Sequence, residues 1–497
     1  MKTLPCTSLL VLGIFLAGFG SAIRARANDA TPYQATQTLS SGNIFPVNGL
    51  AGDAFGQVVA FNNQFLFVSS PGSQPNNKSI SGAVFVYRRN GNTYQQTQVI
   101  TTGGTGDHLA MLQILSQDDW LILGTIGTPV GPQVNDAVSD QDFRGEVLIY
   151  RLNHLTGQWG WNQTLDSTLP DLADLNSIAN GGIPVLETQQ GANFGLRMSL
   201  DAEQGWLLVS ALYQNRLDGQ NQVVRNAGKV YAFQLNQSGT WQLAQSLDNP
   251  DGPGENDAFG AAVAVKGRVA MIGNGSVFQG PHVGNSAVYV YTLNQGSWSF
   301  SQRLTGTQQT VTPLSFPQFS GNVLGIGDAF GNAIALTENH AVISAPLETP
   351  ASPAFTGAAY FFKRKNDGGN ERWVLSQRVE SDDPNSLAFG AFNVVLKDDI
   401  AVIADLGRTG PAGPFQGAAH VFKRKGAAWD KIATLTDPAG TPSGGFGVGG
   451  AIDENGRLAI GSSPFLGFFV PVIFRPPPAA APPVAPGKVI IYQAVDQ

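Results

Sequence analysis

The sequence is poor in the residues that carry most protein chemistry. It has one cysteine, five histidines and only 13% charged residues in 497 positions. A single cysteine excludes an intramolecular disulfide and a metal site built from several thiolates. The motifs G-x-S-x-G and H-E-x-x-H, which mark common hydrolases and zinc proteases, do not occur. We therefore expect a protein that is not an enzyme.

Positive charge is also scarce. The chain carries 29 Lys and Arg against 36 Asp and Glu, a formal net charge of -7, and its pI is about 5.3. Nucleic-acid-binding proteins need a basic surface, so this balance argues against nucleic acid as the main partner. Glycine and proline, in contrast, are abundant at 60 and 30 residues. That composition suits many short strands joined by turns, and it predicts an all-β fold.

The N-terminal segment has the pattern of a secretory signal peptide, residues 1–27. Lys2 supplies a positive charge, SLLVLGIFLAGFG forms the apolar core, and Ala25-Arg26-Ala27 is a small-x-small cleavage site, with a cut after Ala22 as the alternative. Cys6 lies inside this segment. The sequence thus predicts a mature chain, residues 28–497, without cysteine or a membrane span. It would be located in a periplasm, at a cell surface or in the medium.

A phrase built on Phe-Gly recurs along the chain. Each copy precedes two short apolar runs around a tight polar turn, as expected for a hairpin of buried strands, and a long variable loop follows. There are six clear copies and a degenerate one, GDHLA at 106–110; the clear copies are Phe55-Gly56, Phe194-Gly195, Phe259-Gly260, Phe330-Gly331, Phe389-Gly390 and Phe446-Gly447.

Two further runs follow each phrase. The third run opens at Gly or Ser, as in GAVFVYR from Gly82, and occurs seven times. The fourth has an aromatic residue, usually a Gln four positions later, and then an aliphatic residue. It occurs six times after a third run: Tyr94/Gln98/Ile100, Trp159/Gln163/Leu165, Trp241/Gln245/Leu247, Trp298/Gln302/Leu304, Trp373/Gln377/Val379 and Trp429/Ala433/Leu435.

The missing seventh copy stands at the other end of the chain, as Tyr33, Gln37 and Leu39. The C-terminus stops just after its third run. This arrangement predicts a seven-bladed β-propeller of four-stranded antiparallel blades within residues 28–497. Residues 33–40 would be the outer strand of the last blade and would close the ring by pairing the two ends of the chain.

The Phe-Gly opening, the Ser-Ala-Pro end of the second run at Ser344-Ala345-Pro346 and the Gly-Ala start of the third run at Gly357 resemble FG-GAP repeats. Those repeats build the propeller of integrin α-subunits and of many secreted bacterial proteins. The resemblance implies a propeller and a role in adhesion or binding outside the cell.

The chain departs from the calcium loops of integrin-like repeats, which have the form D-x-D-x-D-G. Its first hairpins hold only pairs such as Asp118-Asp119. The nearest acidic cluster lies in a different loop and lacks EF-hand spacing: Asp136, Asp140, Asp142 and Glu146. We expect no cofactor and no metal site; calcium in that loop is the alternative.

The connections between second and third strands are long and would share one face of the ring, where loops on a rigid scaffold commonly bind ligands. Aromatic residues stand shortly before several third strands. The candidate ligand-binding residues are Phe143, Phe278, His282, Phe355 and Phe415. They could stack on a ligand; the alternative is that these phenylalanines fix their loops to the blade. Phe278 with His282 breaks the regular spacing and is the better binding candidate.

Residues 462–487 form a proline-rich insertion in the last blade, which either packs on the ring or docks on a partner. The function expected from these patterns is a secreted binding or adhesion module that recognises an extracellular protein or glycan through the long-loop face. The alternatives are a structural component of the cell envelope, or a polysaccharide-active enzyme with a site across the same face.

Overall fold

A computed structural model of the chain describes residues 32–42, 53–74, 81–102, 109–126, 145–165, 192–274, 286–307, 312–315, 323–349, 355–441, 444–463 and 487–495. The predicted signal segment and most of the proline-rich insertion lie outside these ranges, so both stay predictions. The described residues form strands and turns without any helix. Accordingly, this part of the chain holds no helix of the length and hydrophobicity that a membrane span requires.

The strands form seven four-stranded antiparallel sheets, as predicted. Blades 1 to 3 are β2 (Val59–Asn62), β3 (Phe65–Ser70), β4 (Ala83–Asn90) and β5 (Thr93–Ile100); β6 (Ile114–Gln117), β7 (Trp120–Thr125), β8 (Glu146–Asn153) and β9 (Gln158–Leu165); and β10 (Phe194–Asp201), β11 (Trp206–Ala211), β14 (Lys229–Leu235) and β15 (Trp241–Leu247).

Blades 4 to 6 are β16 (Phe259–Lys266), β17 (Val269–Asn274), β18 (Ala287–Asn294) and β19 (Ser297–Leu304); β22 (Ile334–Leu336), β23 (His340–Ala345), β24 (Ala358–Asp367) and β25 (Asn370–Val379); and β26 (Phe389–Lys397), β27 (Ile400–Asp405), β28 (Ala418–Lys425) and β29 (Ala428–Leu435). Two small hairpins lie in the connections: β12 (Arg216–Leu217) with β13 (Val223–Val224), and β20 (Thr312–Ser315) with β21 (Val323–Ile326).

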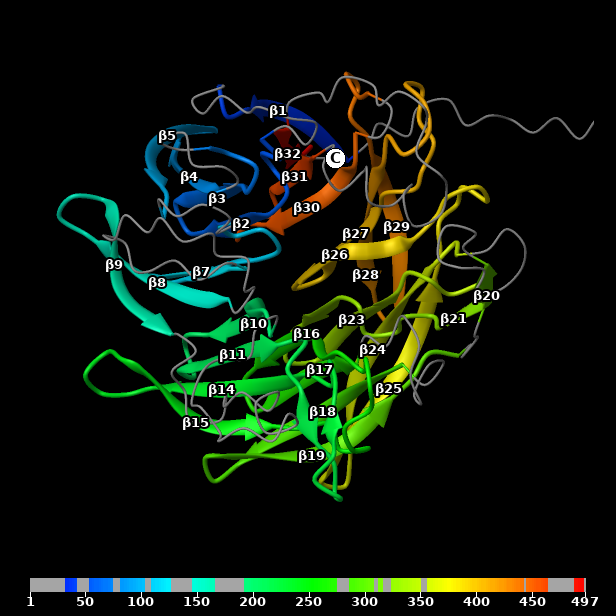
Figure 1. Cartoon of the computed structure of the whole chain (residues 1–497). Coiled ribbons are helices and arrows are strands. Elements are labelled where there is room, and N and C mark those ends of the chain that lie inside the picture. The colour runs from blue at the N-terminus through cyan, green and yellow to red at the C-terminus, as the bar shows by residue number, and fades with distance from the viewer. Residues whose placement is uncertain are drawn as a thin grey trace, which may run out of the picture. The chain divides into compact units, whose positions relative to one another are not determined.

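Blade 7 contains both ends of the described chain. It has the order β30 (Phe446–Ile452), β31 (Leu458–Ser462), β32 (Lys488–Ala494) and β1 (Tyr33–Leu39). Strand β1 pairs antiparallel with β32, from Tyr33 opposite Ala494 to Leu39 opposite Val489, and Figure 1 shows the blue β1 beside the red end of the chain. This pairing confirms the predicted closure of the ring by the N-terminal strand.

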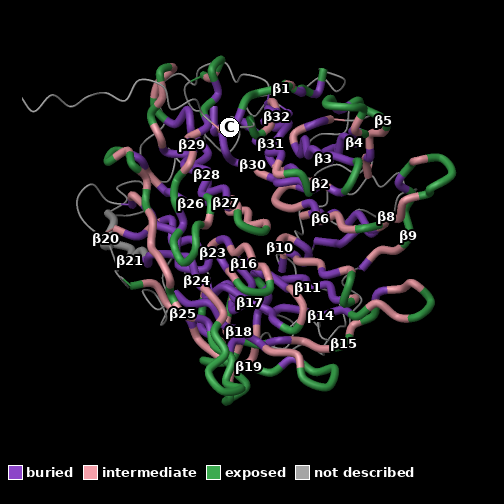
Figure 2. The backbone as a smooth tube through the Cα atoms, turned by 180° about the vertical axis from the view of Figure 1, so that it is seen from behind, coloured by how far each residue is buried: buried purple, intermediate pink, exposed green. Residues whose placement is uncertain are grey.

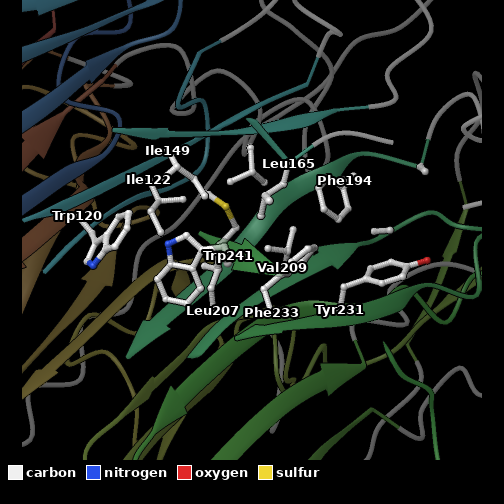
Figure 3. Packing of buried hydrophobic residues seen from close by; sticks show 14 residues of the cluster. Trp120, Ile122, Ile149, Leu165, Phe194, Leu207, Val209, Tyr231, Phe233 and Trp241 are labelled. Carbon is white, nitrogen blue, oxygen red and sulfur yellow. The ribbon is translucent and has the colours of Figure 1, made fainter. Parts of the chain in front are cut away.

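Hydrophobic cores lie between the blades. Seven clusters of buried residues each draw on two adjacent blades, and together they run round the ring. Figure 3 shows one of them, in which Trp120 and Ile149 of blade 2 face Phe194, Val209 and Trp241 of blade 3. The backbone drawn in Figure 2 is accordingly buried in its inner strands and exposed at the hairpin tips. No blade therefore buries its faces alone.

The Phe-Gly phrase is a joint between neighbouring blades. The Phe55 ring is fully buried, lies 5.3 Å from the Phe85 ring of its own blade, and belongs to the cluster that includes Val489 of blade 7. Gly56 has φ +85°, and a Cβ there would lie 2.5 Å from the carbonyl oxygen of Lys488. Only glycine meets both constraints without strain. The repeat is thus set by the packing of one blade on the next.

The recurrent Gln of the outer strand makes a contact that the sequence pattern does not reveal. In six blades its amide clasps the backbone of the aromatic residue on the next blade's outer strand. Gln245 of β15, for example, accepts from Trp298 N at 2.8 Å and donates to Trp298 O at 2.8 Å. The other five pairs are Gln37–Tyr94, Gln98–Trp159, Gln163–Trp241, Gln302–Trp373 and Gln377–Trp429.

The seventh junction has no such clasp, because Ala433 occupies the position on β29 that faces blade 7. Side-chain amides therefore fasten every junction of the ring except the one between blades 6 and 7.

The closing strand predicts a first test. Tyr33 and Leu39 are 5% and 7% exposed, so we expect Tyr33→Ala and Leu39→Ala each to lower the free energy of unfolding by roughly 2 to 5 kcal/mol, as buried large side chains do. Deleting residues 33–40 should destabilise the whole ring. Thermal unfolding measures both effects, with exposed Gln34→Ala on the same strand as the control. An unchanged melting temperature after the deletion would show that β1 does not close the ring.

The clasps predict a second test. Gln245→Ala removes two hydrogen bonds and should lower the free energy of unfolding by roughly 1 to 3 kcal/mol, whereas Gln242→Ala, at an exposed position of the same strand, should have little effect. The converse substitution Ala433→Gln should raise stability by supplying a clasp to Tyr33. Chemical denaturation of the three variants decides the matter: equal losses in Gln245→Ala and Gln242→Ala would contradict the proposed role of the clasp.

Candidate functional site

The two faces of the ring differ in their connections. One face carries tight hairpin turns, such as residues 63–64 between β2 and β3 and residues 267–268 between β16 and β17. The other carries the connections between second and third strands and those between blades, which are long: residues 212–228 in blade 3, including β12 and β13, and residues 406–417 in blade 6. We call this second side the long-loop face.

Three of the five predicted ligand-binding residues, Phe143, Phe278 and His282, lie outside the described residues. Phe355 and Phe415 are described, and their side chains are 3% and 9% exposed. Their carbonyl oxygens accept hydrogen bonds from the next blade, Phe355 O from Ala388 N at 2.8 Å and Phe415 O from Gly445 N at 3.2 Å. These contacts fit the alternative in which the phenylalanines fix their loops. Ligand binding by the five residues stays a prediction.

A central cavity of about 180 Å³ lies among the innermost strands, and a smaller one of about 50 Å³ adjoins it. Polar side chains in the walls of the two cavities bridge neighbouring blades. Gln57 Nε2 donates to Met111 O at 2.5 Å, and Asn393 Nδ2 donates to Gly447 O at 3.1 Å. Gln113 Oε1 accepts from Met198 N. The wall is thus polar but, at these positions, uncharged.

Arg197 of β10 is the exception. Of the described residues that line either cavity, it is the only charged one, and it lines both. Its Nε donates to Ala261 O of blade 4 at 3.1 Å. Among the described residues no carboxylate pairs with it. Within the described part of the chain its terminal nitrogens have no hydrogen-bond acceptor.

Tyr213, a residue of the long-loop face, interacts electrostatically with this arginine. It follows β11 in the 212–228 loop, its N donates to Ala192 O at 3.1 Å, and its side chain is 42% exposed. Burial lowers the pKa of Arg197, whereas the nearby Tyr213 raises it. Burial also raises the pKa of Tyr213, which the charge of Arg197 counteracts. The pKa of each group therefore depends on the charge of the other.

Two more features distinguish the cavities: Gln57 lines the smaller one, and Phe392 lines both. Gln57 is 2% exposed, and its Oε1 has no hydrogen-bond donor in the described part of the chain. Phe392 of β26 lines both cavities with φ +64°, a left-handed conformation that is a genuine outlier for an aromatic residue. It lies in the irregular part of β26, where the register shifts between Phe389 and Val394. That irregularity holds Phe392 at the cavity.

Sequence reasoning missed this site although the repeats contain a signal for it. Arg197 is the third residue after Phe194 of its phrase. The equivalent residues of the other six phrases are all uncharged: Val58, Leu112, Ala262, Ala333, Phe392 and Gly449. Aligning the repeats by their phrases isolates one arginine in a column of apolar residues and glycine. Its meaning required knowing that this column lines the channel.

The described residues hold no group of three or more metal-ligating side chains. His420 of β28 is 1% exposed; its Nε2 lies 2.9 Å from Asp405 Oδ2 and its Nδ1 lies 3.2 Å from Thr434 Oγ1. Both ring nitrogens are thus engaged within blade 6, as expected of a packed histidine.

Asp328 and Glu348 are two buried carboxyls of blade 5. Burial raises the pKa of Asp328 to about 6, the hydrogen bond from Phe330 N counteracts the rise, and the like charge of Glu348 adds to it. Oδ2 of Asp328 has no hydrogen-bond partner among the described residues. This carboxyl therefore holds its proton more tightly in the folded chain than in the unfolded one.

The raised pKa predicts how stability depends on pH. The stabilising contribution is full below pH 4 and is lost as the pH rises to about 6, a loss of roughly 3 kcal/mol. We expect Asp328→Asn to match the unaltered chain near pH 4 and to be more stable at pH 8. Thermal unfolding across this range, with exposed Asp430→Asn as control, checks the prediction. Parallel pH profiles for Asp328→Asn and the unaltered chain would refute it.

Comparison with known proteins adds two structural likenesses. No family model matches the chain, and no curated protein matches it. The chain is similar to Sqt1 of Saccharomyces cerevisiae, with TM-score 0.44 and 8% identity over 93% of this chain and 99% of that one. It is also similar to a hypothetical selenium-binding protein from Sulfolobus tokodaii, with TM-score 0.44 and 11% identity over 75% of each chain.

Proposed function

We propose that the chain is a secreted, non-catalytic binding module that recognises an extracellular protein or glycan through its long-loop face. The observation that carries this proposal is the asymmetry of the ring. The hairpin face has tight turns, whereas the long-loop face gathers the variable connections and carries the exposed Tyr213. A rigid scaffold with long loops on one side is the usual arrangement for recognition.

The rest of the ring supports this role by its rigidity. Six Gln clasps and seven interblade cores fix the loop ends relative to one another, so little ordering is needed when a ligand binds. The signal-like segment at residues 1–27 supports secretion, and the FG-GAP-like phrases support a role in adhesion. The paucity of histidine and of charged residues favours binding over the alternative of a polysaccharide-active enzyme.

Binding of the purified chain to arrays of extracellular proteins and glycans, with and without calcium, tests the proposal. We expect a saturable ligand whose retention falls at least about tenfold in Tyr213→Ala and in a variant of Phe278 and His282, because an exposed aromatic at a binding face contributes strongly. Trp161→Ala is the matched control: Trp161 is 51% exposed but belongs to outer strand β9.

Three outcomes would overturn the proposal. If Trp161→Ala weakens retention as much as the loop variants do, the ligand does not use the long-loop face. If the chain turns over a glycan, the enzyme alternative replaces a non-catalytic module. If no ligand is retained under either condition, the structural alternative in the cell envelope takes its place.

A further inference from the structure

We propose that Asn162, on the outer strand of blade 2, is a modification site that carries an N-linked oligosaccharide. Asn162, Gln163 and Thr164 form the tripeptide N-x-T, which is the acceptor for this modification in secreted chains. The inference rests on the secretion that the proposed function includes, and it assigns a role to the outer wall of the ring. Three features support it: the contacts of Asn162, the other copies of the repeat, and the exposed Trp161 beside it.

Asn162 is an exposed residue whose side chain makes no contact that holds the fold. It lies in β9, the edge strand of its blade, and its side chain makes no hydrogen bond within the described part of the chain. The register of β9 with β8 shifts between Trp161 and Gln163, so Asn162 is an extra residue with no partner across the pair. Its amide nitrogen is therefore accessible and unused.

The equivalent bulge residues of the other blades show what the fold requires at this position. In four blades the residue is Ser or Thr, and in the remaining two it is Ala244 or Ile432. Each Ser or Thr hydroxyl donates to a backbone carbonyl of the third strand: Thr36 to Ile491, Thr97 to Val86, Ser301 to Val290 and Ser376 to Phe361. Of the polar residues in this column, Asn162 alone makes no such bond, so its amide is not explained by folding.

Trp161 leaves an apolar surface beside the site. Its side chain is 51% exposed, and its Nε1 donates to Thr164 Oγ1 at 3.1 Å, which ties the indole to the acceptor tripeptide. An indole face in contact with water is unfavourable. The C–H face of a sugar ring packs on such a surface, so the first sugar attached to Asn162 would cover it.

The other acceptor tripeptides in the described residues differ in burial and contacts. Asn274, which begins residues 274–276, ends β17 and is 1% exposed, so the fold has no room for an oligosaccharide there. Asn236 begins residues 236–238, and its Oδ1 accepts from Ser238 N at 3.0 Å and from Thr240 N at 2.9 Å, which holds the turn between β14 and β15. Asn162 is thus the acceptor asparagine among them that is both exposed and unengaged.

The modification joins Asn162 to a sugar that a lipid diphosphate carries. The amide nitrogen Nδ2 forms a bond to C1 of the first sugar, the bond from C1 to the polyprenyl diphosphate breaks, and the diphosphate leaves with the electron pair. The amide proton passes to a base of the transferase. Because β9 is the edge strand of its blade, the oligosaccharide leaves the long-loop face free for a ligand.

Mass spectrometry of the secreted full chain tests the inference. The chain is expressed with its own N-terminal segment in cells that N-glycosylate secreted proteins. Peptide N-glycosidase in heavy-oxygen water then converts each modified Asn into a labelled Asp. We expect the label at Asn162 in most of the secreted chain and no label at Asn274. Asn162→Gln should remove one oligosaccharide and make the chain migrate faster on a denaturing gel.

Thr164 supplies a matched pair of variants. Thr164→Ala destroys the tripeptide and should leave Asn162 unmodified, whereas Thr164→Ser keeps the tripeptide and an acceptor for Trp161 Nε1 and should retain the oligosaccharide. Loss of the oligosaccharide in Thr164→Ser as well as in Thr164→Ala would contradict the assignment. Equal labelling of Asn274 and Asn162 in the secreted chain would also overturn it, because the fold would then not select the site.

A second expression distinguishes failure of this inference from failure of the proposed function. If the chain with its own N-terminal segment stays inside the cell, the secretion that the proposed function includes is wrong. The same chain is then exported with an unrelated cleavable leader in place of residues 1–27. An unmodified Asn162 in that secreted chain would overturn the inference, and a labelled Asn162 would support it whatever the natural location.

Discussion

Burial between blades is the interaction on which the rest of the structure depends. A four-stranded sheet with inner strands as apolar as Phe65–Ser70 or Trp206–Ala211 cannot leave either face in water. Each of the seven main clusters takes residues from two neighbouring blades, so every blade is stabilised by the two beside it. The Phe-Gly phrase, the glycine that opens the third strand and the Gln clasp all act at this one kind of junction. The residues that recur in the sequence are therefore those that form the contacts between neighbouring blades.

The junction between blades 6 and 7 is held together by different side chains from those of the other six junctions. It has Ala433 in place of the clasping Gln, and it must also accommodate the two chain ends. Tyr492 OH donates to Thr436 O at 3.2 Å, and Lys488 Nζ lies 2.5 Å from Asp437 Oδ2, whose side chain is 3% exposed. These contacts join β32 to the segment that follows β29. At this junction β32 contacts blade 6 through Tyr492 and Lys488, while β1 completes blade 7 and closes the ring.

The sequence was sufficient for the blades, their number and the closing strand, because these depend on local strand patterns and on counting copies. It was insufficient for contacts between blades. The partner of Gln245 is 53 residues away at Trp298, and no local pattern indicates it. The left-handed conformation of Ala258 and Ala388, just before their phenylalanines, likewise depends on hydrogen bonds to the loop of the preceding blade. Phe355 depends on a distant contact in the same way, since its carbonyl oxygen accepts a hydrogen bond from Ala388 N of the next blade.

The candidate site illustrates how a repeat protein can separate folding from function. At the third position after the first residue of the phrase, Val58, Leu112 and Ala262 show that an uncharged side chain meets the needs of the channel wall. Arg197 at this position gains one hydrogen bond from folding and loses much of its hydration. Burial lowers its pKa, which records that loss. An arginine that the fold does not need, and that lines the cavity, is more readily explained by what enters the cavity than by what holds the ring together.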